Sequence, residues 1–380
     1  MRRPPFALLI ALGIFVAIVG SSHDYFAQRL VRDTALPAPW SGYATWTIAT
    51  LAVLLFVQPV AARRFGPRVG GVLGWPAFVW LGASFYLLVG LWTSDTALSL
   101  AGLHGTDVAR LRAEGLCALV GVILLYGIRA ATMPPAVKTV EVRLSGWPAA
   151  LDGYRVVQIS DIHIGSMIGR RFAERLVARC NALAPDLVAI TGDLVDGSVR
   201  ALAHAVEPFA ELRARDGVYF VTGNHDHYSG AERWVQKVAD LGIEVLRNRR
   251  VTIGRAQAKF DLAGVDDLSS SRLEVGRGHD IEAALAGWSQ CAPLLLLAHN
   301  PRTFDQAHPR GVSLQLSGHT HGGQLWPFGW LVRLQTRYVA GLYRRGRSTL
   351  YVSRGTGYWG PPIRVLAPAE ITELVLRPNT

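Results

Sequence analysis

Three long stretches without a formal charge constrain the fold of this chain more than any other feature of its sequence. They cover residues 4–22, 34–62 and 69–94, and a membrane-spanning helix needs about 20 mostly apolar residues. A shorter stretch, 115–128, continues past Arg129, whose side chain can reach the interface from a helix end. The pattern predicts an N-terminal all-α transmembrane bundle of about four helices, with spans near 5–22, 41–62, 70–92 and 114–132. The alternative is a buried, soluble all-α domain.

Charge is distributed unevenly along the chain, which predicts a domain boundary near residue 130. Residues 1–132 carry 15 charged residues and the other 248 residues carry 52. We therefore expect a transmembrane anchor domain at 1–133, a linker and first strand at 134–150, and a second domain at 151–380. The net charge of +11 suits either nucleic acid or anionic lipid as a neighbour, and the apolar first third favours lipid.

The basic residues that flank the predicted spans favour a cytoplasmic location for both termini. Eight of them would lie on the side of the chain ends and four on the other side, so the positive-inside bias places the second domain in the cytoplasm. In an alternative interpretation the first stretch is a cleaved signal peptide, since a basic start precedes its apolar run. Three spans would then remain, and the second domain would face outward.

The region after residue 150 has the pattern of an α/β enzyme. Short apolar runs typical of buried strands alternate with helical patterns, and after residue 245 short strands with turns follow. This order predicts a layered α/β sandwich with mixed sheets. Strands are expected at 154–160, 187–191, 218–222, 294–298 and 313–316, and helices at 170–183, 200–213 and 231–241.

Each predicted strand runs into a group of side chains that can bind metal. These groups are Asp161-Ile162-His163, Gly192-Asp193, Gly223-Asn224-His225-Asp226, His299-Asn300 and Gly318-His319-Thr320-His321. Ligands of open α/β sheets lie beyond the carboxyl ends of the strands, so the five groups are expected to converge. Residues two apart in an extended chain point the same way, and glycines beside them allow sharp turns. The mixture of oxygen and nitrogen ligands suits Mn, Fe or Zn better than Ca or Mg alone.

Taken singly, these groups carry little information, because Asp-x-His or Gly-Asp is common at turns and strand ends. Their joint occurrence in this order resembles the motif blocks of the calcineurin-like metallophosphoesterase superfamily, over about residues 138–378. The chain is most similar to the bacterial membrane-associated branch, which is related to UDP-2,3-diacylglucosamine hydrolases and to transmembrane metallophosphoesterase proteins. In that branch a His-Thr-His-Gly-Gly-Gln block precedes segments like 351–355 and 364–370. The resemblance implies a multi-pass protein of the bacterial inner (cell) membrane.

The resemblance also implies roles for individual residues around two divalent metal ions (Mn, Fe or Zn). The first ion would be held by Asp161, His163 and His321, the second by Asn224, His299 and His319, and Asp193 would bridge both. His225 would act on the leaving group, and Asp226 would orient or charge-stabilise its imidazole. Hydrolysis would use a metal-activated hydroxide, without a nucleophilic Ser or Cys.

The stretch 325–332, just past the last expected ligand, is too aromatic for a typical exposed loop, and arginines follow it. We expect Trp326, Trp330 and Arg333 to form a basic, apolar rim that meets an anionic lipid head group. The alternative is that Trp326, Phe328 and Trp330 pack inward against the sandwich.

These observations predict a membrane-anchored phosphoesterase that hydrolyses a phosphodiester or pyrophosphate bond, on a lipid-linked substrate such as UDP-2,3-diacylglucosamine in lipid A biosynthesis. One alternative is a transmembrane sensor or transport module that its phosphatase domain regulates. The other is a broad-specificity phosphomonoesterase or nuclease. The expected partners are the bilayer and a phosphorylated, lipid-linked substrate. No nucleic acid is expected, because nothing in the sequence resembles a nucleic-acid-reading module.

Overall fold

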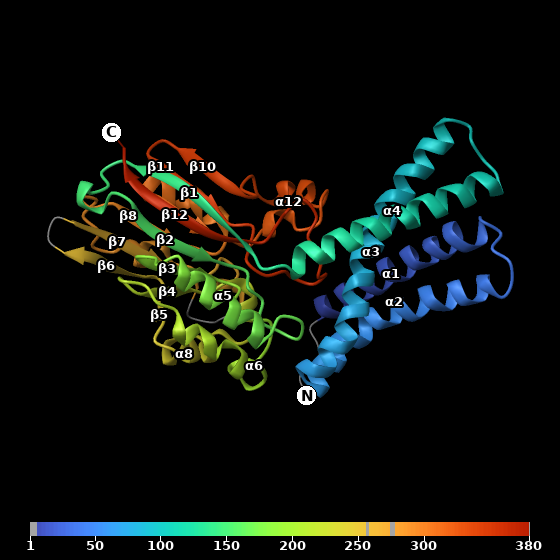
Figure 1. Cartoon of the computed structure of the whole chain (residues 1–380), viewed down its shortest axis with the longest axis horizontal. Coiled ribbons are helices and arrows are strands. Elements are labelled where there is room, and N and C mark those ends of the chain that lie inside the picture. The colour runs from blue at the N-terminus through green and yellow to red at the C-terminus, as the bar shows by residue number, and fades with distance from the viewer. Residues whose placement is uncertain (1–5, 256–257, 274–277, 380) are drawn as a thin grey trace. The chain divides into compact units, whose positions relative to one another are not determined.

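The computed structural model describes residues 6–255, 258–273 and 278–379, and the chain divides into two compact units, Met1–Gly127 and Ile128–Thr380 (Figure 1). The first unit is helical. Its elements are α1 (Phe6–Ala27), the π-helical turn η1 (Gln28–Arg32), α2 (Trp40–Phe65), α3 (Pro67–Leu100) and α4 (Thr106–Thr132), which continues into the second unit.

Three helices in the described part of the chain, α2, α3 and α4, are long and apolar enough to cross a membrane. The predicted number of about four spans is therefore corrected to three for these residues. The remaining predicted span, near 5–22, forms helix α1, but residue 5 and several side chains at the start of this helix lie outside the description. Helix α4 begins eight residues before the predicted span and so includes Arg110 and Arg112.

Several charged side chains in the helical unit are paired with one another. Asp95 of α3 accepts a hydrogen bond from the Tyr25 hydroxyl at 2.6 Å and forms ion pairs with Arg29, at 2.9 Å, and with Arg112. Arg29 also contacts Asp33 at 2.9 Å. Isolated charges are costly among apolar helices. The pairing therefore explains how four charged residues are accommodated there.

The second unit contains two six-stranded mixed sheets. The first sheet has the order β1 (Ala136–Leu144), β12 (Glu370–Pro378), β2 (Tyr154–Ile159), β3 (Leu187–Thr191), β4 (Val218–Val221) and β5 (Glu244–Val245). The second has the order β10 (Gly341–Arg345), β11 (Ser348–Val352), β9 (Leu314–Ser317), β8 (Leu294–Leu297), β7 (Ala258–Gly264) and β6 (Arg249–Arg255).

The two sheets pack face to face, and helices cover their outer faces, so the predicted mixed-sheet sandwich is confirmed (Figure 1). Side chains alternate along each strand, so Val156 of β2 lies in the core between the sheets and Val157 lies under the helices. The first sheet is covered by α5 (Arg170–Ala182), α6 (Val199–Val206) and α8 (Ala231–Asp240), and the second by α10 (Ile281–Leu285) and α11 (Phe304–Ala307).

The remaining helices are short. They are η2 (Ala149–Leu151), η3 (Glu207–Glu211), α7 (Asn224–Tyr228), α9 (Ser270–Leu273), η4 (Pro301–Thr303), η5 (His308–Arg310), η6 (His321–Gly323) and α12 (Gly329–Gln335). The helix expected at 200–213 ends as an α-helix at Val206 and continues as the 3-10 helix η3, where Pro208 has no N–H to donate to an α-helical bond.

Parallel pairing brings the ends of the important strands to common edges. Strands β2, β3 and β4 run parallel to one another, and so do β7, β8, β9 and β11. The carboxyl ends of each parallel set therefore lie at one edge of its sheet, and the segments that follow them can share one site.

Candidate metal centre

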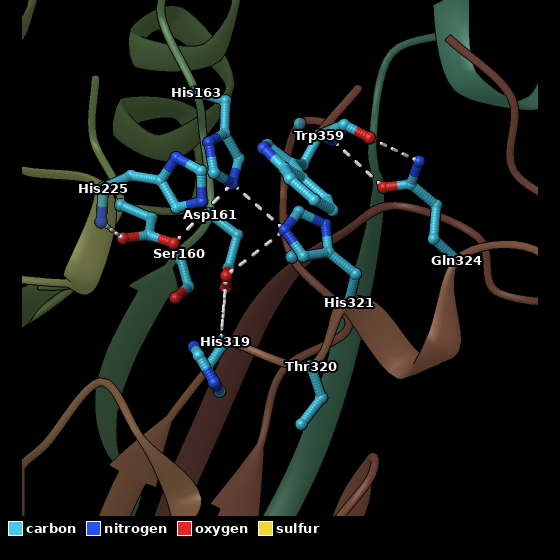
Figure 2. Close-up of polar contacts among 12 residues, drawn as sticks. Ser160, Asp161, His163, His225, His319, Thr320, His321, Gln324 and Trp359 are labelled. Carbon is cyan, nitrogen blue, oxygen red and sulfur yellow. Dashed lines mark hydrogen bonds and ion pairs between the residues drawn. The ribbon is translucent and has the colours of Figure 1, made fainter. Parts of the chain in front are cut away.

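The seven predicted metal ligands come together at the carboxyl ends of β2, β3, β4, β8 and β9. His and Asp residues among them form clusters whose ligand atoms lie within 4.8 Å of one another. Figure 2 shows Asp161, His163 and His321 directed toward one small volume, and His319, whose backbone N–H donates to Asp161, beside them. The convergence expected from the strand-end pattern is therefore present.

The first cluster consists of Asp161, His163 and His321. The Nε2 atoms of the two imidazoles are 3.0 Å apart, and Nε2 of His321 lies 3.5 Å from Oδ1 of Asp161 (Figure 2). All three side chains are buried. Three ligand atoms from two strand ends thus face one point.

The second cluster consists of Asp193, His299 and His319, with Asn224 beside it. Oδ1 of Asn224 lies 3.2 Å from Nε2 of His299 and 2.9 Å from Nδ1 of His319. Oδ2 of Asp193 is 3.2 Å from Nε2 of His299 and 3.8 Å from Nε2 of His163 in the first cluster. One carboxylate oxygen therefore faces both clusters.

Hydrogen bonds on the far side of two imidazoles leave their Nε2 atoms available as ligands. Nδ1 of His299 donates to the carbonyl of Thr191 at 2.8 Å, and Nδ1 of His163 contacts Oδ2 of Asp196 at 3.0 Å. Acceptors in these positions orient metal-binding histidines and make them more basic. The chemistry of this donor set fits a pair of divalent cations.

The electrostatics of the site also favour cations. Burial opposes protonation of the His163 ring, but the carboxylates of Asp196, Asp193 and Asp161 outweigh burial and raise the pKa of His163 to about 9. Burial would raise the pKa of the Asp193 carboxyl, but the rings of His299 and His163 hold it well below its usual range. The clustered carboxylates create a negative potential that divalent ions can neutralise.

Five of the ligands have left-handed backbone conformations, which are uncommon for residues other than glycine. Their φ angles are 52° for Asp161, 55° for His163, 52° for Asp193, 72° for His319 and 51° for His321. The sequence analysis expected each pair of ligands to point the same way because residues two apart do so in an extended chain. The left-handed backbone conformations show that this explanation is wrong. The ligands converge because the backbone turns at each of them.

All three glycines beside the predicted ligands are needed for space, because a Cβ atom on any of them would lie within 3.0 Å of neighbouring atoms. Gly192 has a φ of 89°, as the expected sharp turn requires, but Gly223 has a φ of −104°. A Cβ atom on Gly223 would overlap the backbone and side chain of Asp193, and one on Gly318 would overlap the side chains of Ser160 and Asp161. These glycines let neighbouring strand ends approach closely enough to form one site.

His225 lies beside the first cluster and is oriented by Asp196. Its Nδ1 atom is 2.7 Å from Oδ1 of Asp196, whose other oxygen contacts His163. The rings of His163, Tyr228 and Trp359 pack edge-on against it, with centroids 4.8, 5.4 and 5.6 Å away. Its side chain is 20% exposed, so one side remains accessible.

The prediction that Asp226 orients the imidazole of His225 is corrected by this geometry. The carboxylate of Asp226 accepts hydrogen bonds from the backbone N–H groups of Asp193, Leu194, Val195 and Gly223, at 2.8–3.2 Å. Burial and the carboxylate of Asp193 raise the pKa of Asp226 to about 7. Its position at the start of α7 directs its side chain toward the loop after β3, so it supports the backbone around Asp193.

Sequence reasoning left the role of Asp196 undecided and missed Asp267. Asp267 follows β7 at the same kind of strand end as the other groups, so the Asp266-Asp267 pair carried a usable signal. Its side chain is buried, and Oδ2 has no hydrogen-bond partner among the residues that the structure describes. The charge of Asp267 also opposes the loss of a proton from His299 and His319.

A buried arginine and a glutamine complete the surroundings of the first cluster. Arg364 donates to the carbonyls of Gly357 and Ala367, and burial lowers its pKa to about 10. The side chain of Gln324 donates to the carbonyl of Trp359 at 2.9 Å and accepts from its N–H at 3.0 Å (Figure 2). Gln324 thereby holds Trp359 at the edge of the site.

The three residues predicted to contact substrate lie on the surface. Trp326 is 55% exposed and Trp330 is 62% exposed, so neither is packed inward as the alternative required. Arg333 is exposed, and its guanidinium lies 4.9 Å from the ring centroid of Trp330. Their contact with a substrate stays a prediction.

The close approach at Gly223 leads to a test. Replacing Gly223 with Ala should displace Asp193, and we expect metal affinity to fall by about 10–100-fold, the range seen when residues that support metal ligands are replaced. Metal content of the purified, full-length protein can be measured by mass spectrometry during titration with a chelator. Gly169→Ala is the matched control, because no atom lies within 4 Å of the added Cβ and its φ is −121°. Equal metal affinity in the two variants would contradict the role given to Gly223.

Comparison with known proteins is consistent with this geometry. The family model described as calcineurin-like phosphoesterase matches residues 154–323, a range that contains every predicted ligand. A transmembrane protein with metallophosphoesterase domain from Danio rerio is 42% identical over 267 residues, which are 68% of this chain and 61% of that protein. The match thus spans less than two thirds of that relative.

Two bacterial relatives are matched over more of their length. The uncharacterized metallophosphoesterase Cj0846 of Campylobacter jejuni is 34% identical over 278 residues, which are 71% of each chain. The uncharacterized metallophosphoesterase YkuE of Bacillus subtilis is 32% identical over 268 residues, which are 66% of this chain and 90% of that protein. The chain therefore belongs to the calcineurin-like metallophosphoesterase family.

Proposed function

We propose that this protein is a membrane-anchored, dinuclear-metal phosphoesterase that hydrolyses a phosphodiester or pyrophosphate bond. The observation that carries the proposal is the placement of His225, a partly exposed imidazole held by Asp196 beside two groups of metal ligands. A phosphoesterase needs both a site for cations and a proton donor for the leaving oxygen.

Two divalent ions fit the ligands described above, and Mn, Fe and Zn suit their mixture of nitrogen and oxygen atoms. When bound, such ions supply a strong nucleophile at neutral pH and neutralise charge on the phosphoryl oxygens. Asp161, His163 and His321 would hold one ion, and Asn224, His299 and His319 the other. Asp193 would contribute to both, since its Oδ2 atom faces both groups.

His225 is placed to hold and deliver a proton. Its Nδ1 atom is occupied by the contact with Asp196, so Nε2 is the atom left for the departing oxygen of a substrate. Asp196 contacts two histidines at once, and the charges of His163 and His225 outweigh burial and hold its pKa below its usual range. The hydrogen bond to Asp196 orients the imidazole of His225, so that Nε2 is the atom that can act as a general acid.

Replacement of His225 by Ala tests the assignment of the proton donor. We expect the variant to bind metal normally, because all seven predicted ligands remain in place, and to lose turnover by about 10²–10⁴-fold. Hydrolysis of bis(p-nitrophenyl) phosphate with Mn²⁺ measures turnover, and mass spectrometry measures bound metal. Asp193→Ala is the comparison, and it should lose both metals. A fully active His225 variant would show that another group donates the proton.

Replacement of Asp196 by Asn tests how His225 is oriented. The amide cannot provide charge to both histidines, so we expect turnover to fall by about 10–100-fold. The loss should appear mainly in kcat and should persist when metal is saturating. Asp240→Asn, an exposed position on α8, is the control. An unchanged kcat in the Asp196 variant would show that another residue orients His225.

A lipid-linked substrate such as UDP-2,3-diacylglucosamine is supported by the exposed apolar residues near the site. Trp326 and Trp330 are more than half exposed, and Arg333 beside Trp330 adds a positive charge. This combination suits an anionic head group attached to acyl chains. Lipid A biosynthesis is the corresponding physiological setting that we propose.

Release of UMP from UDP-2,3-diacylglucosamine in detergent micelles with Mn²⁺ tests this substrate directly. We expect the wild-type protein to release UMP and the His225→Ala variant not to. Cleavage of bis(p-nitrophenyl) phosphate without release of UMP would retain the chemistry and remove this lipid from the proposal.

For the location, we propose the bacterial inner membrane with the catalytic domain in the cytoplasm. The support is the excess of basic residues, eight against four, on the side of the chain ends. The measurement is whether a membrane-impermeant reagent labels an engineered cysteine in the catalytic domain of intact cells. Labelling would contradict the proposal, because it would place the domain outside the cytoplasm.

A further inference from the structure

Helix α12 belongs to the second unit, which we call the catalytic unit, and none of its residues is buried. Its apolar side chains are instead directed to the surface, where Trp330 is 62% exposed, Leu331 53% and Leu334 83%. A helix in a water-soluble domain normally buries its apolar side chains against the core. Helix α12 therefore presents apolar area that the fold of the catalytic unit does not cover.

A second segment extends the same exposed area. Trp326 donates its N–H to the carbonyl of Val365, and Val365 donates its N–H to the carbonyl of Gln324. These bonds hold the start of the α12 segment against the loop that carries Trp359 and Leu366, which are 54% and 66% exposed. We call the six exposed residues the apolar surface: Trp326, Trp330, Leu331, Leu334, Trp359 and Leu366.

The apolar surface adjoins the catalytic site. The ring of Trp359 lies 5.6 Å from the ring of His225, and Gln324, which holds Trp359, is three residues beyond the ligand His321 (Figure 2). One end of the apolar surface is therefore at the proton donor, and the other is at α12.

The charge of the same segment is strongly positive. Residues 325–347 contain five arginines and no Asp or Glu. Arg333 extends over the face of Trp330 at 4.9 Å, an arrangement in which the aliphatic stem covers apolar area and the guanidinium stays at its rim. Apolar side chains beside arginines are typical of segments that lie in the interface of an anionic bilayer.

We propose that the apolar surface docks the catalytic domain on the bilayer, with α12 in the head-group region of anionic lipids. This proposal rests on the proposed function, because docking would open the catalytic site toward substrates held in the membrane. A bilayer would lie close to the catalytic domain, since three helices in the described part of the chain are long and apolar enough to cross one. Arginines near an anionic membrane add electrostatic attraction to the burial of the apolar side chains, so the two effects act together.

Spin-label accessibility tests the docking without any substrate. We would place a nitroxide at Leu334→Cys and, separately, at Leu366→Cys, in full-length protein with Cys117 and Cys291 replaced by Ser, since both are exposed. The protein would be placed in nanodiscs of equal parts phosphatidylcholine and phosphatidylglycerol. Oxygen concentrates among acyl chains and a nickel chelate stays in water. The ratio of their effects on the relaxation of the nitroxide therefore reports whether lipid or water surrounds the label.

At both positions we expect an oxygen-to-nickel ratio several times that of a label at Ala239→Cys, an exposed position on α8. A ratio equal to that of the control would overturn the proposal. Labels shielded from both reagents would also overturn it, because a protein partner or a second copy would then cover the surface. Hydrolysis of bis(p-nitrophenyl) phosphate by each labelled protein verifies that the site is folded. If the unlabelled wild-type protein did not hydrolyse this ester, that result would count against the proposed function instead.

Discussion

The carboxylate of Asp193 is the constraint on which the rest of the catalytic unit depends. Oδ2 faces both ligand clusters, and Oδ1 accepts the backbone N–H of His225 at 2.8 Å. Its backbone N–H donates to Asp226, and Gly223 leaves room for it. One residue thus fixes the spacing of the two clusters and the start of the helix that carries His225. A buried carboxylate in this position is favourable only if cations neutralise it.

The two-sheet architecture is what allows so many ligands to reach one carboxylate. Each sheet contributes a parallel set of strands, and the residues that follow these strands leave the regular hydrogen-bonding pattern at the same edge. Five ligands then take left-handed backbone conformations. Strain of this kind persists only where the surroundings over-determine it. Here the glycines, the Asp226 carboxylate and the packed strands hold the turns in place.

The sequence predicted the parts of this site that follow from strand ends and missed those that depend on side-chain direction. Periodicity and apolar runs located β3 at residues 187–191, because buried parallel strands have continuous apolar sequences. Nothing in the sequence identifies Asp196 rather than Asp226 as the partner of His225, since Asp226 is next to His225 in the chain and Asp196 is three residues beyond the predicted ligand Asp193. The choice is made by the loop after β3, which directs Asp196 outward to both histidines. Asp267 was missed because no strand was expected at 258–264, so the residues that follow it were not recognised as a strand end.

The exposed residues around the site differ from the predicted ligands in how much of their surface is buried. Six of the seven predicted ligands are buried, whereas Trp326, Trp330 and Leu334 have more than half of their area in contact with solvent. Gln324 joins the two regions, since its side chain holds the Trp359 loop and its backbone carbonyl accepts from Val365. The apolar surface is therefore attached rigidly to the ligand segment that ends at His321. A phosphoryl group held at the ligands would lie at a fixed depth from whatever covers that surface, so substrate selection by the surface requires no movement of the site itself.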